Sequence, residues 1–127
     1  MKYLCLISAE RVMEQLTPDE AAQHWEDYRQ FNLQLRNGKH FVGGNRLLPP
    51  DTAKTVRVRN GKATVTDGPW VETKEQLGGY YIFDAKDMDE ALGLAARIPG
   101  SWIGCVEVRP LAEDSQTVEM LALASGR

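Results

Sequence analysis

A hairpin signal in the middle of the chain constrains the fold more than any other feature. The segments "TVRVR" and "KATVT" alternate apolar and polar residues, and Asn60-Gly61 separates them. A two-residue Asn-Gly loop favours a type I′ turn, which fixes the register of the strands on either side. The register pairs Arg59 with Lys62, Val58 with Ala63, Arg57 with Thr64 and Val56 with Val65, which places the apolar side chains on one face.

A long helix is predicted between the first strand and the hairpin. Thr17 can cap it, Pro18 suits its first position and Glu20 completes a capping box. The helix is expected to end at "NGK", with Gly38 in the left-handed conformation. Its inward face is expected to contain His24, Tyr28, Phe31 and Leu35, with Ala21 and Trp25 beside them.

Four apolar segments are predicted as strands of a main sheet: Lys2–Ala9, "HFVGGNRLL" from His40, "GYYIFD" and "IGCVEVRP". Gly43 and Gly44 indicate a bulge or a close backbone approach in the second of these strands. A short helix precedes the last strand, because Asp87 and Glu90 form a capping pattern there. The apolar side of this helix contains Ala91, Leu92, Ala95 and Ile98.

This order of elements predicts an α+β fold, a ferredoxin-like βαββαβ sandwich with an inserted β-hairpin. Its helices cover only one face of the sheet, and a second copy of the chain is the simplest cover for the other apolar face. We therefore expect a homodimer. We expect one domain over residues 1–111, followed by a tail over residues 112–127. The tail segment "VEMLALA" suits either a strand or a helix, and a partner subunit is a candidate for what it packs against.

Composition argues against several classes of partner. The 127 residues carry a net charge of -3 and no basic run, which disfavours nucleic acid. The apolar run "YLCLISA" is too short to cross a membrane and is a poor signal peptide, so we expect a cytoplasmic protein with no membrane partner. Cys5 and Cys105 lie in apolar runs and are expected as reduced core thiols.

Motifs for cofactors are weak in this sequence. The histidine and cysteine spacing suits no metal site, and "GGN" is neither a P-loop nor a dinucleotide fingerprint. We expect no cofactor, with heme, which needs only one axial histidine, as the remaining alternative.

At "DGPWVETKEQLGGYYIFD" the chain resembles the DGPF-domain branch of the YCII-related proteins. The resemblance runs from Met1 to about Leu111 and includes "MKYLCLI", "FVGGNRLLPP" and the closing "EVRP". Trp70 stands where the family pattern has Phe. The residues that match the pattern are Asp67, Gly68, Pro69, Glu72, Lys74, Glu75, Gly78 and Gly79.

The resemblance implies a ferredoxin-like fold and a dimeric α/β barrel. It also implies a lineage in which enzymes using a His and Asp pair have been proposed. Some members of this branch are associated with extracytoplasmic-function sigma factors, so a sigma-factor-related protein is an implied partner.

Two residues are candidates for acid/base chemistry. Histidine side chains titrate near neutral pH, and His24 lies at the edge of the inward helix face, where it either transfers protons or only buries its ring. Asp67 either joins that chemistry or caps the Asp-Gly-Pro turn with its own side chain. We name His24 and Asp67 as the candidate catalytic residues.

Four further residues are candidates for ligand binding: Trp70, Glu72, Lys74 and Tyr81. Trp70 either plugs the barrel mouth or stacks on a ligand. Lys74 can orient an anionic ligand, although it and Glu72 also suit an exposed loop. Tyr80 and Tyr81 point to opposite faces of one strand. Arg57 and Arg109 lie on strands, and the sequence leaves open which of them faces inward.

The leading hypothesis is a homodimer that binds a small polar or anionic molecule. The sequence leaves open whether it is an enzyme. If it is one, we expect cofactor-independent acid/base chemistry, such as isomerisation or hydrolysis. The alternative is a non-catalytic sensor or regulatory module linked to sigma-factor-dependent transcription.

Overall fold

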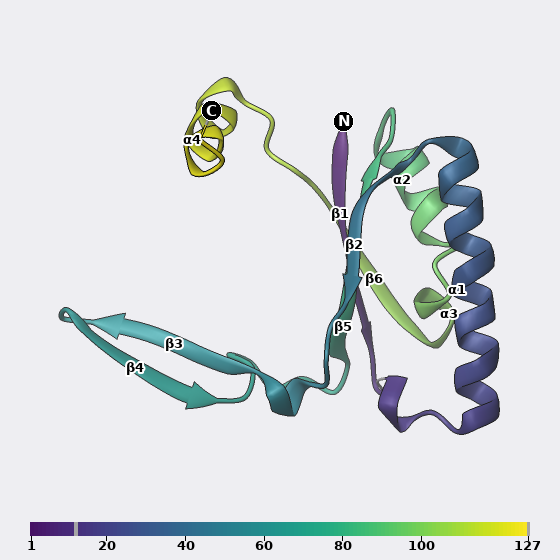
Figure 1. Cartoon of the computed structure of the whole chain (residues 1–127), viewed down its shortest axis with the longest axis horizontal. Coiled ribbons are helices and arrows are strands. Elements are labelled where there is room, and N and C mark those ends of the chain that lie inside the picture. The colour runs from purple at the N-terminus through teal and green to yellow at the C-terminus, as the bar shows by residue number, and fades with distance from the viewer. Residues whose placement is uncertain (12, 127) are drawn as a thin grey trace.

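The structure, a computed structural model, describes residues 1–11 and 13–126. Its main feature is a four-stranded antiparallel sheet with strand order β2-β5-β1-β6 (Figure 1). The strands are β1 (Lys2–Ala9), β2 (Phe41–Arg46), β3 (Lys54–Arg59), β4 (Lys62–Asp67), β5 (Gln76–Asp84) and β6 (Gly104–Pro110). The helices are α1 (Pro18–Gly38), α2 (Met88–Ala95), α3 (Gly100–Ile103) and α4 (Ser115–Ala124), with short 3-10 turns η1 (Met13–Gln15) and η2 (Pro50–Thr52).

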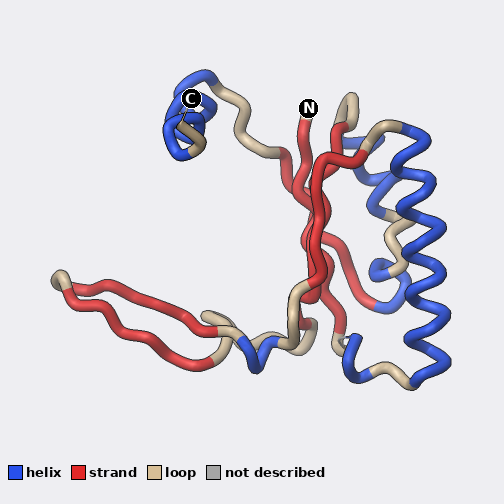
Figure 2. Tube along the Cα trace, in the orientation of Figure 1, coloured by secondary structure: helices blue, strands red, loops and turns tan. Residues whose placement is uncertain are grey.

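This arrangement confirms the α+β class, the antiparallel sheet and the inserted hairpin. The strand order is that of a ferredoxin-like sandwich, with β3 and β4 forming a separate two-stranded sheet. Helices α1, α2 and α3 lie on one side of the main sheet (Figure 2). The hairpin and α4 both extend from the opposite side.

Helix α1 begins as predicted and ends one residue later than predicted. Thr17 accepts a hydrogen bond from the Glu20 backbone N–H, and the Glu20 carboxylate accepts one from the Thr17 N–H, which completes the capping box. At the other end Lys39, with φ 59°, takes the left-handed position, whereas Gly38 is still helical. The prediction of a left-handed Gly38 was therefore wrong.

The hairpin has the predicted register. Val56 pairs with Val65 and Val58 with Ala63, and the turn residues Asn60 and Gly61 have positive φ, as a type I′ turn requires. The apolar face of the hairpin is exposed in the single chain, because Val56 and Val65 are each 64% accessible.

The double glycine of β2 has both of the properties predicted for it. The register with β5 shifts between Phe41 and Gly43, which marks a bulge. A Cβ on Gly44 would lie 2.9 Å from the Tyr80 carbonyl oxygen and 2.9 Å from the Tyr81 ring. Glycine at 44 therefore leaves room for Tyr81 beneath α1.

The core lies between the main sheet and helices α1 and α2. It includes Phe31 and Leu35 of α1, Tyr3 and Cys5 of β1, Tyr81 and Phe83 of β5, and Ala91, Leu94, Ala95 and Ile98. Two core predictions were wrong. Leu92 is 49% accessible and Leu94 is buried instead. Cys105 is exposed because residues alternate along β6, so that Val106 and Val108 face the helices.

The opposite face of the sheet is apolar along its two middle strands. Leu4 and Leu6 alternate with the buried Tyr3 and Cys5 of β1, so they point away from the helices. Across the ladder, Leu4 pairs with Ile82 and Leu6 with Tyr80. We call Leu4, Leu6, Tyr80 and Ile82 the open face.

The tail forms helix α4, which resolves the choice between strand and helix. Asp114 caps it by accepting a hydrogen bond from the Thr117 N–H. Its apolar side chains are exposed: Val118, Met120, Leu121 and Leu123. Within the described part of the chain, no helix is both long and apolar enough to cross a membrane.

Candidate functional site

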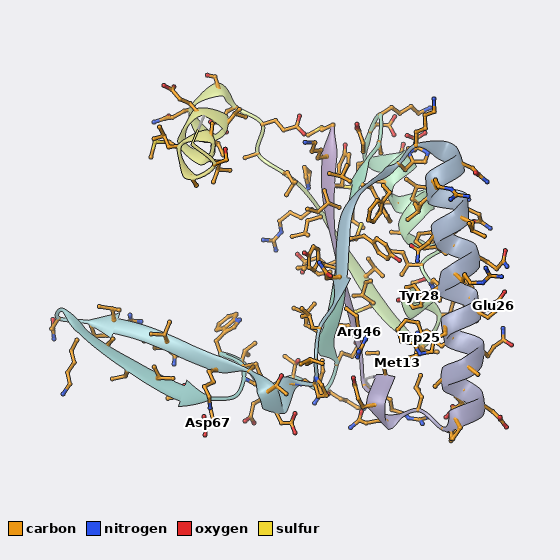
Figure 3. The ribbon with its side chains drawn as sticks, viewed as in Figure 1. Met13, Trp25, Glu26, Tyr28, Arg46 and Asp67 are labelled. Atoms are coloured by element: carbon orange, nitrogen blue, oxygen red, sulfur yellow. The ribbon has the colours of Figure 1, made fainter. Side chains whose placement is uncertain are left out.

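A cleft of about 890 Å³ lies between α1 and the main sheet. Residues of α1 form one wall, residues of β2 and β5 form the other, and Met13 and Leu16 close one end. Figure 3 shows Trp25 and Tyr28 on α1 directed toward the sheet, with Arg46 of β2 opposite Trp25. We call this space the α1 cleft.

His24 and Tyr28 form one part of the wall, one helical turn apart. Their rings meet edge to face, with centroids 4.9 Å apart. The Tyr28 hydroxyl accepts a hydrogen bond of 3.2 Å from the Gly100 backbone N–H, and burial raises the Tyr28 pKa to about 12. Burial lowers the pKa of His24, although the nearby Asp27 opposes the shift. His24 is therefore mainly neutral at neutral pH and can accept a proton.

Tyr81 and Asn32 form the wall deeper in the cleft. The Tyr81 hydroxyl donates a 2.7 Å hydrogen bond to Asn32 Oδ1, and the Tyr81 ring packs edge to face on Phe31 at 5.6 Å. Burial raises the Tyr81 pKa to about 12. This phenol therefore stays protonated at neutral pH, as a donor held in one orientation.

The mouth of the cleft holds an ion pair beside an aromatic ring. Arg46 Nη1 lies 2.5 Å from Glu14 Oε1, and the Arg46 guanidinium carbon lies 5.9 Å from the centroid of the Trp25 ring. Glu14 belongs to η1, and its neighbour Met13 lines the cleft.

The charged side chains around the cleft share one sign. Among the described residues that line it, every charged residue is basic, although the whole chain carries a net charge of -3. These residues are Arg11, Arg29, Arg36, Lys39 and Arg46. Glu14, Glu20 and Glu26 pair with three of these arginines from outside the lining. A local excess of positive charge favours an anionic ligand.

The structure brings together only some of the residues predicted for the site. His24 and Tyr81 both line the α1 cleft. Asp67 lies on the hairpin, on the far side of the sheet from α1 (Figure 3), so the two predicted catalytic residues do not meet within one chain. The Asp67 carboxylate pairs with Lys54 at 2.5 Å.

The other predicted ligand-binding residues lie on the exposed loop after the hairpin. Trp70 is 76% accessible, and Glu72 is exposed. Lys74 Nζ lies 3.3 Å from Glu10 Oε1, so it ties this loop to the end of β1. This loop does not line the α1 cleft in the single chain.

Both strand arginines left open by the sequence are exposed. Arg57 lies on the hairpin, and Arg109 pairs with Glu107 two residues before it on β6. Neither points into the core.

Asn32 is a cleft residue that sequence reasoning missed. A signal was present, because Asn32 follows Tyr28 by four residues and His24 by eight, which places all three on one side of α1. The residues that the structure describes contain no group of three or more His, Cys, Asp or Glu side chains able to hold a metal ion.

Comparison with known proteins places the chain in a family. Residues 1–114 match the YCII-related domain. An uncharacterized protein of Rhizobium meliloti (strain 1021) is 46% identical over 69 residues, which are 53% of this chain and 56% of that protein. The chain thus matches little more than half the length of that relative.

A solved structure of 5-chloro-2-hydroxyhydroquinone dehydrochlorinase from Burkholderia phenoliruptrix AC1100, in complex with 2,5-dihydroxybenzoquinone, aligns with a TM-score of 0.49. The two sequences are 13% identical, and the alignment covers 91% of this chain and 98% of that one. The match over residues 1–114 shows that the chain belongs to the YCII-related domain family.

Proposed function

We propose that this protein binds a small organic anion with an apolar body in the α1 cleft. The observation that carries the proposal is that every charged residue among the described residues lining the cleft is basic, in an otherwise largely apolar and aromatic lining. A ligand with an apolar ring and an anionic group suits both properties, because ligand sites combine apolar walls with a few placed polar groups.

We further propose that His24 acts as a general base on this ligand. Its ring is half-buried at the cleft wall, and its lowered pKa keeps it ready to accept a proton. The Tyr81 hydroxyl donates its single proton to Asn32, so toward the ligand it serves as a fixed hydrogen-bond acceptor. Proton abstraction followed by reprotonation, as in an isomerisation, needs no cofactor.

Binding is tested with three matched probes: 1-naphthoate, neutral 1-naphthamide and cationic 1-naphthylmethylammonium. Trp25 lines the cleft and reports through its fluorescence, and Trp70→Phe is the matched control because Trp70 lies outside it. We expect naphthoate to bind most tightly and the cation most weakly, in the wild type and in Trp70→Phe alike. Equal affinity for the three probes would contradict the proposal.

We propose that two copies of the chain associate through the open face. This face is a strip of apolar side chains on the side of the sheet that the helices leave bare, and the exposed hairpin valines and α4 lie on the same side (Figure 1). Residues 112–127 then pack on the partner subunit.

Association is tested by measuring mass in solution. The wild type is expected at about twice the chain mass of 14.2 kDa. Ile82→Glu on the open face should give a single chain, whereas Leu92→Glu, on the exposed side of α2, should leave the dimer intact. A wild type of single-chain mass would refute this arrangement.

We propose that, within the YCII-related family, the chain belongs to the DGPF branch, because the residues of "DGPWVETKEQLGG" match the pattern of that branch. On its composition, we propose that the protein is cytoplasmic.

The second candidate function is a regulatory module that acts through a sigma-factor-related protein. The observation that favours it is the exposed apolar side of α4, where Leu121 is 68% accessible and Leu123 66% accessible. Recovery of a sigma factor with the wild type, and its loss with Leu121→Lys, would support this role. Recovery of the protein's own second copy alone would count against it.

A further inference from the structure

Arg46 differs from the other basic residues of the α1 cleft in what surrounds it. Among the described residues that line the cleft, it is the cation that lies on a strand of the main sheet, and its guanidinium lies beside the Trp25 ring. Arg11 makes two hydrogen bonds to the Glu20 carboxylate and one to the Gln15 carbonyl, so its donors are largely occupied. Arg29 pairs with Glu26, three residues before it on the same helix, rather than with a carboxylate of another element.

The partner of Arg46 is a carboxylate on a lightly held segment. Glu14 belongs to η1, a single turn of three residues in which no residue is buried. The Arg46 contact joins η1 directly to β2 at the cleft mouth. The Glu14 carboxylate therefore occupies one face of donors on a guanidinium that lines the cleft and whose carbon lies 5.9 Å from the centroid of the Trp25 ring.

We propose that Arg46 is the anchor for a ligand carboxylate and that Glu14 is an internal competitor for the same guanidinium. The proposal rests on the proposed function and narrows its ligand class to planar carboxylic acids. The ligand carboxylate replaces that of Glu14 on Arg46, and its ring lies against Trp25 inside the cleft. A guanidinium suits this exchange because its planar donors match carboxylate geometry, whichever molecule supplies the carboxylate.

Exchange of carboxylates also couples binding to movement of η1. When Glu14 leaves Arg46, η1 loses its ion pair to β2, while the Arg11 contacts to Glu20 and to Gln15 persist. Met13 and Leu16 line the end of the cleft on either side of that contact. Binding of a carboxylate therefore loosens the segment that closes this end of the cleft.

The test compares Glu14→Gln and Arg46→Gln, alone and combined, using 1-naphthoate and 1-naphthamide as probes. Glu26→Gln is the matched control, because it makes the same chemical change in another Arg–Glu pair (Figure 3). Both side chains of the Arg46–Glu14 pair are more than a third exposed, so we expect Glu14→Gln to tighten naphthoate binding about two- to fivefold, the scale of a solvent-screened ion pair. Arg46→Gln should weaken it by at least the same factor, and amide binding should change less than twofold in either variant.

The combined variant distinguishes competition for Arg46 from a purely structural role of the Glu14–Arg46 ion pair. If Glu14 acts through Arg46, Glu14→Gln has no effect on naphthoate binding once Arg46 is replaced. Hydrogen exchange at the η1 amides should rise in the wild type when naphthoate binds. Glu26→Gln should leave both probe affinities within twofold.

Two failures can be told apart. In the first, both probes bind, but Glu14→Gln changes the two affinities equally, or Arg46→Gln still binds naphthoate more tightly than naphthamide. This result would refute the Arg46 anchor and leave the proposed ligand site intact. In the second, neither probe binds the wild type or any variant. This result would refute the proposed function and, with it, the Arg46 anchor.

Discussion

Replacing Gly100 by alanine tests the packing that holds Tyr28 in the cleft wall. A Cβ at this position would lie 2.5 Å from Ile7 Cγ2 and 2.8 Å from the Tyr28 hydroxyl. Contacts this short force Ile7 and Tyr28 to move, and overpacking of this kind costs about 1–3 kcal/mol. The gain in helix propensity is below about 1 kcal/mol, because Gly100 is the first residue of a short helix. We expect Gly100→Ala to lower the free energy of unfolding by about 2 kcal/mol.

Gly93→Ala is the matched control for this substitution. Gly93 lies inside α2, and a Cβ there would meet nothing within 4 Å. The same chemical change should therefore raise the free energy of unfolding by about 0.5–1 kcal/mol through helix propensity alone. The two glycine-to-alanine variants are expected to shift stability in opposite directions.

Urea unfolding followed by circular dichroism measures both effects. A loss of 2 kcal/mol lowers the urea midpoint by about 1 M for a typical slope of 2 kcal/mol/M. All variants must be compared at one protein concentration, because association stabilises the folded state. A Gly100→Ala variant as stable as the wild type would refute the tight packing of Gly100 against Ile7 and Tyr28.

Three other changes test the core, the cleft and its pH dependence. Leu35→Ala should lower the free energy of unfolding by about 2–5 kcal/mol in urea titration, because Leu35 is 1% accessible. Tyr81→Phe should cost about 1 kcal/mol in the same assay through loss of its bond to Asn32, and an Asn32→Ala background should abolish the difference. Burial lowers the pKa of His24 in the folded state below its ordinary value. The contribution of His24 to stability is therefore complete above about pH 6.5 and is lost as pH falls from there through the folded-state pKa. In His24→Gln, the free energy of unfolding should lack this dependence on pH.

These outcomes can each fail in a distinct way. Equal pH slopes for the wild type and His24→Gln would show that His24 titrates as in the unfolded chain. A full cost of Tyr81→Phe in the Asn32→Ala background would show that the hydroxyl is stabilised by another group.

The parts of the fold that depend on local chemistry could be predicted from the sequence. The hairpin register follows from Asn60-Gly61 and the alternation beside it, and the start of α1 follows from Thr17 and Glu20. The exposure of Cys105 could not be predicted, because its strand alternates correctly but the sequence does not say which face the helices cover.

The site depends on contacts between distant segments, and it was predicted less well. His24 and Tyr81 follow from helix and strand periodicity, and both line the cleft. The pairing of Arg46 with Glu14 spans 32 positions and depends on the path of η1, for which the sequence has no local signal. Asp67 lies away from the cleft because the hairpin extends from the opposite side of the sheet, a direction that its own residues do not encode.

The place of β1 in the sheet has a consequence for how the chain reaches its folded state. Leu4 pairs with Ile82 on one side and with Arg109 on the other, so the first strand is completed by segments about 80 and 105 positions later in the chain. During synthesis, the backbone N–H and C=O groups on both edges of this strand stay without their native partners until β5 and β6 have left the ribosome. The nascent chain is therefore most prone to aggregation before its last strand emerges.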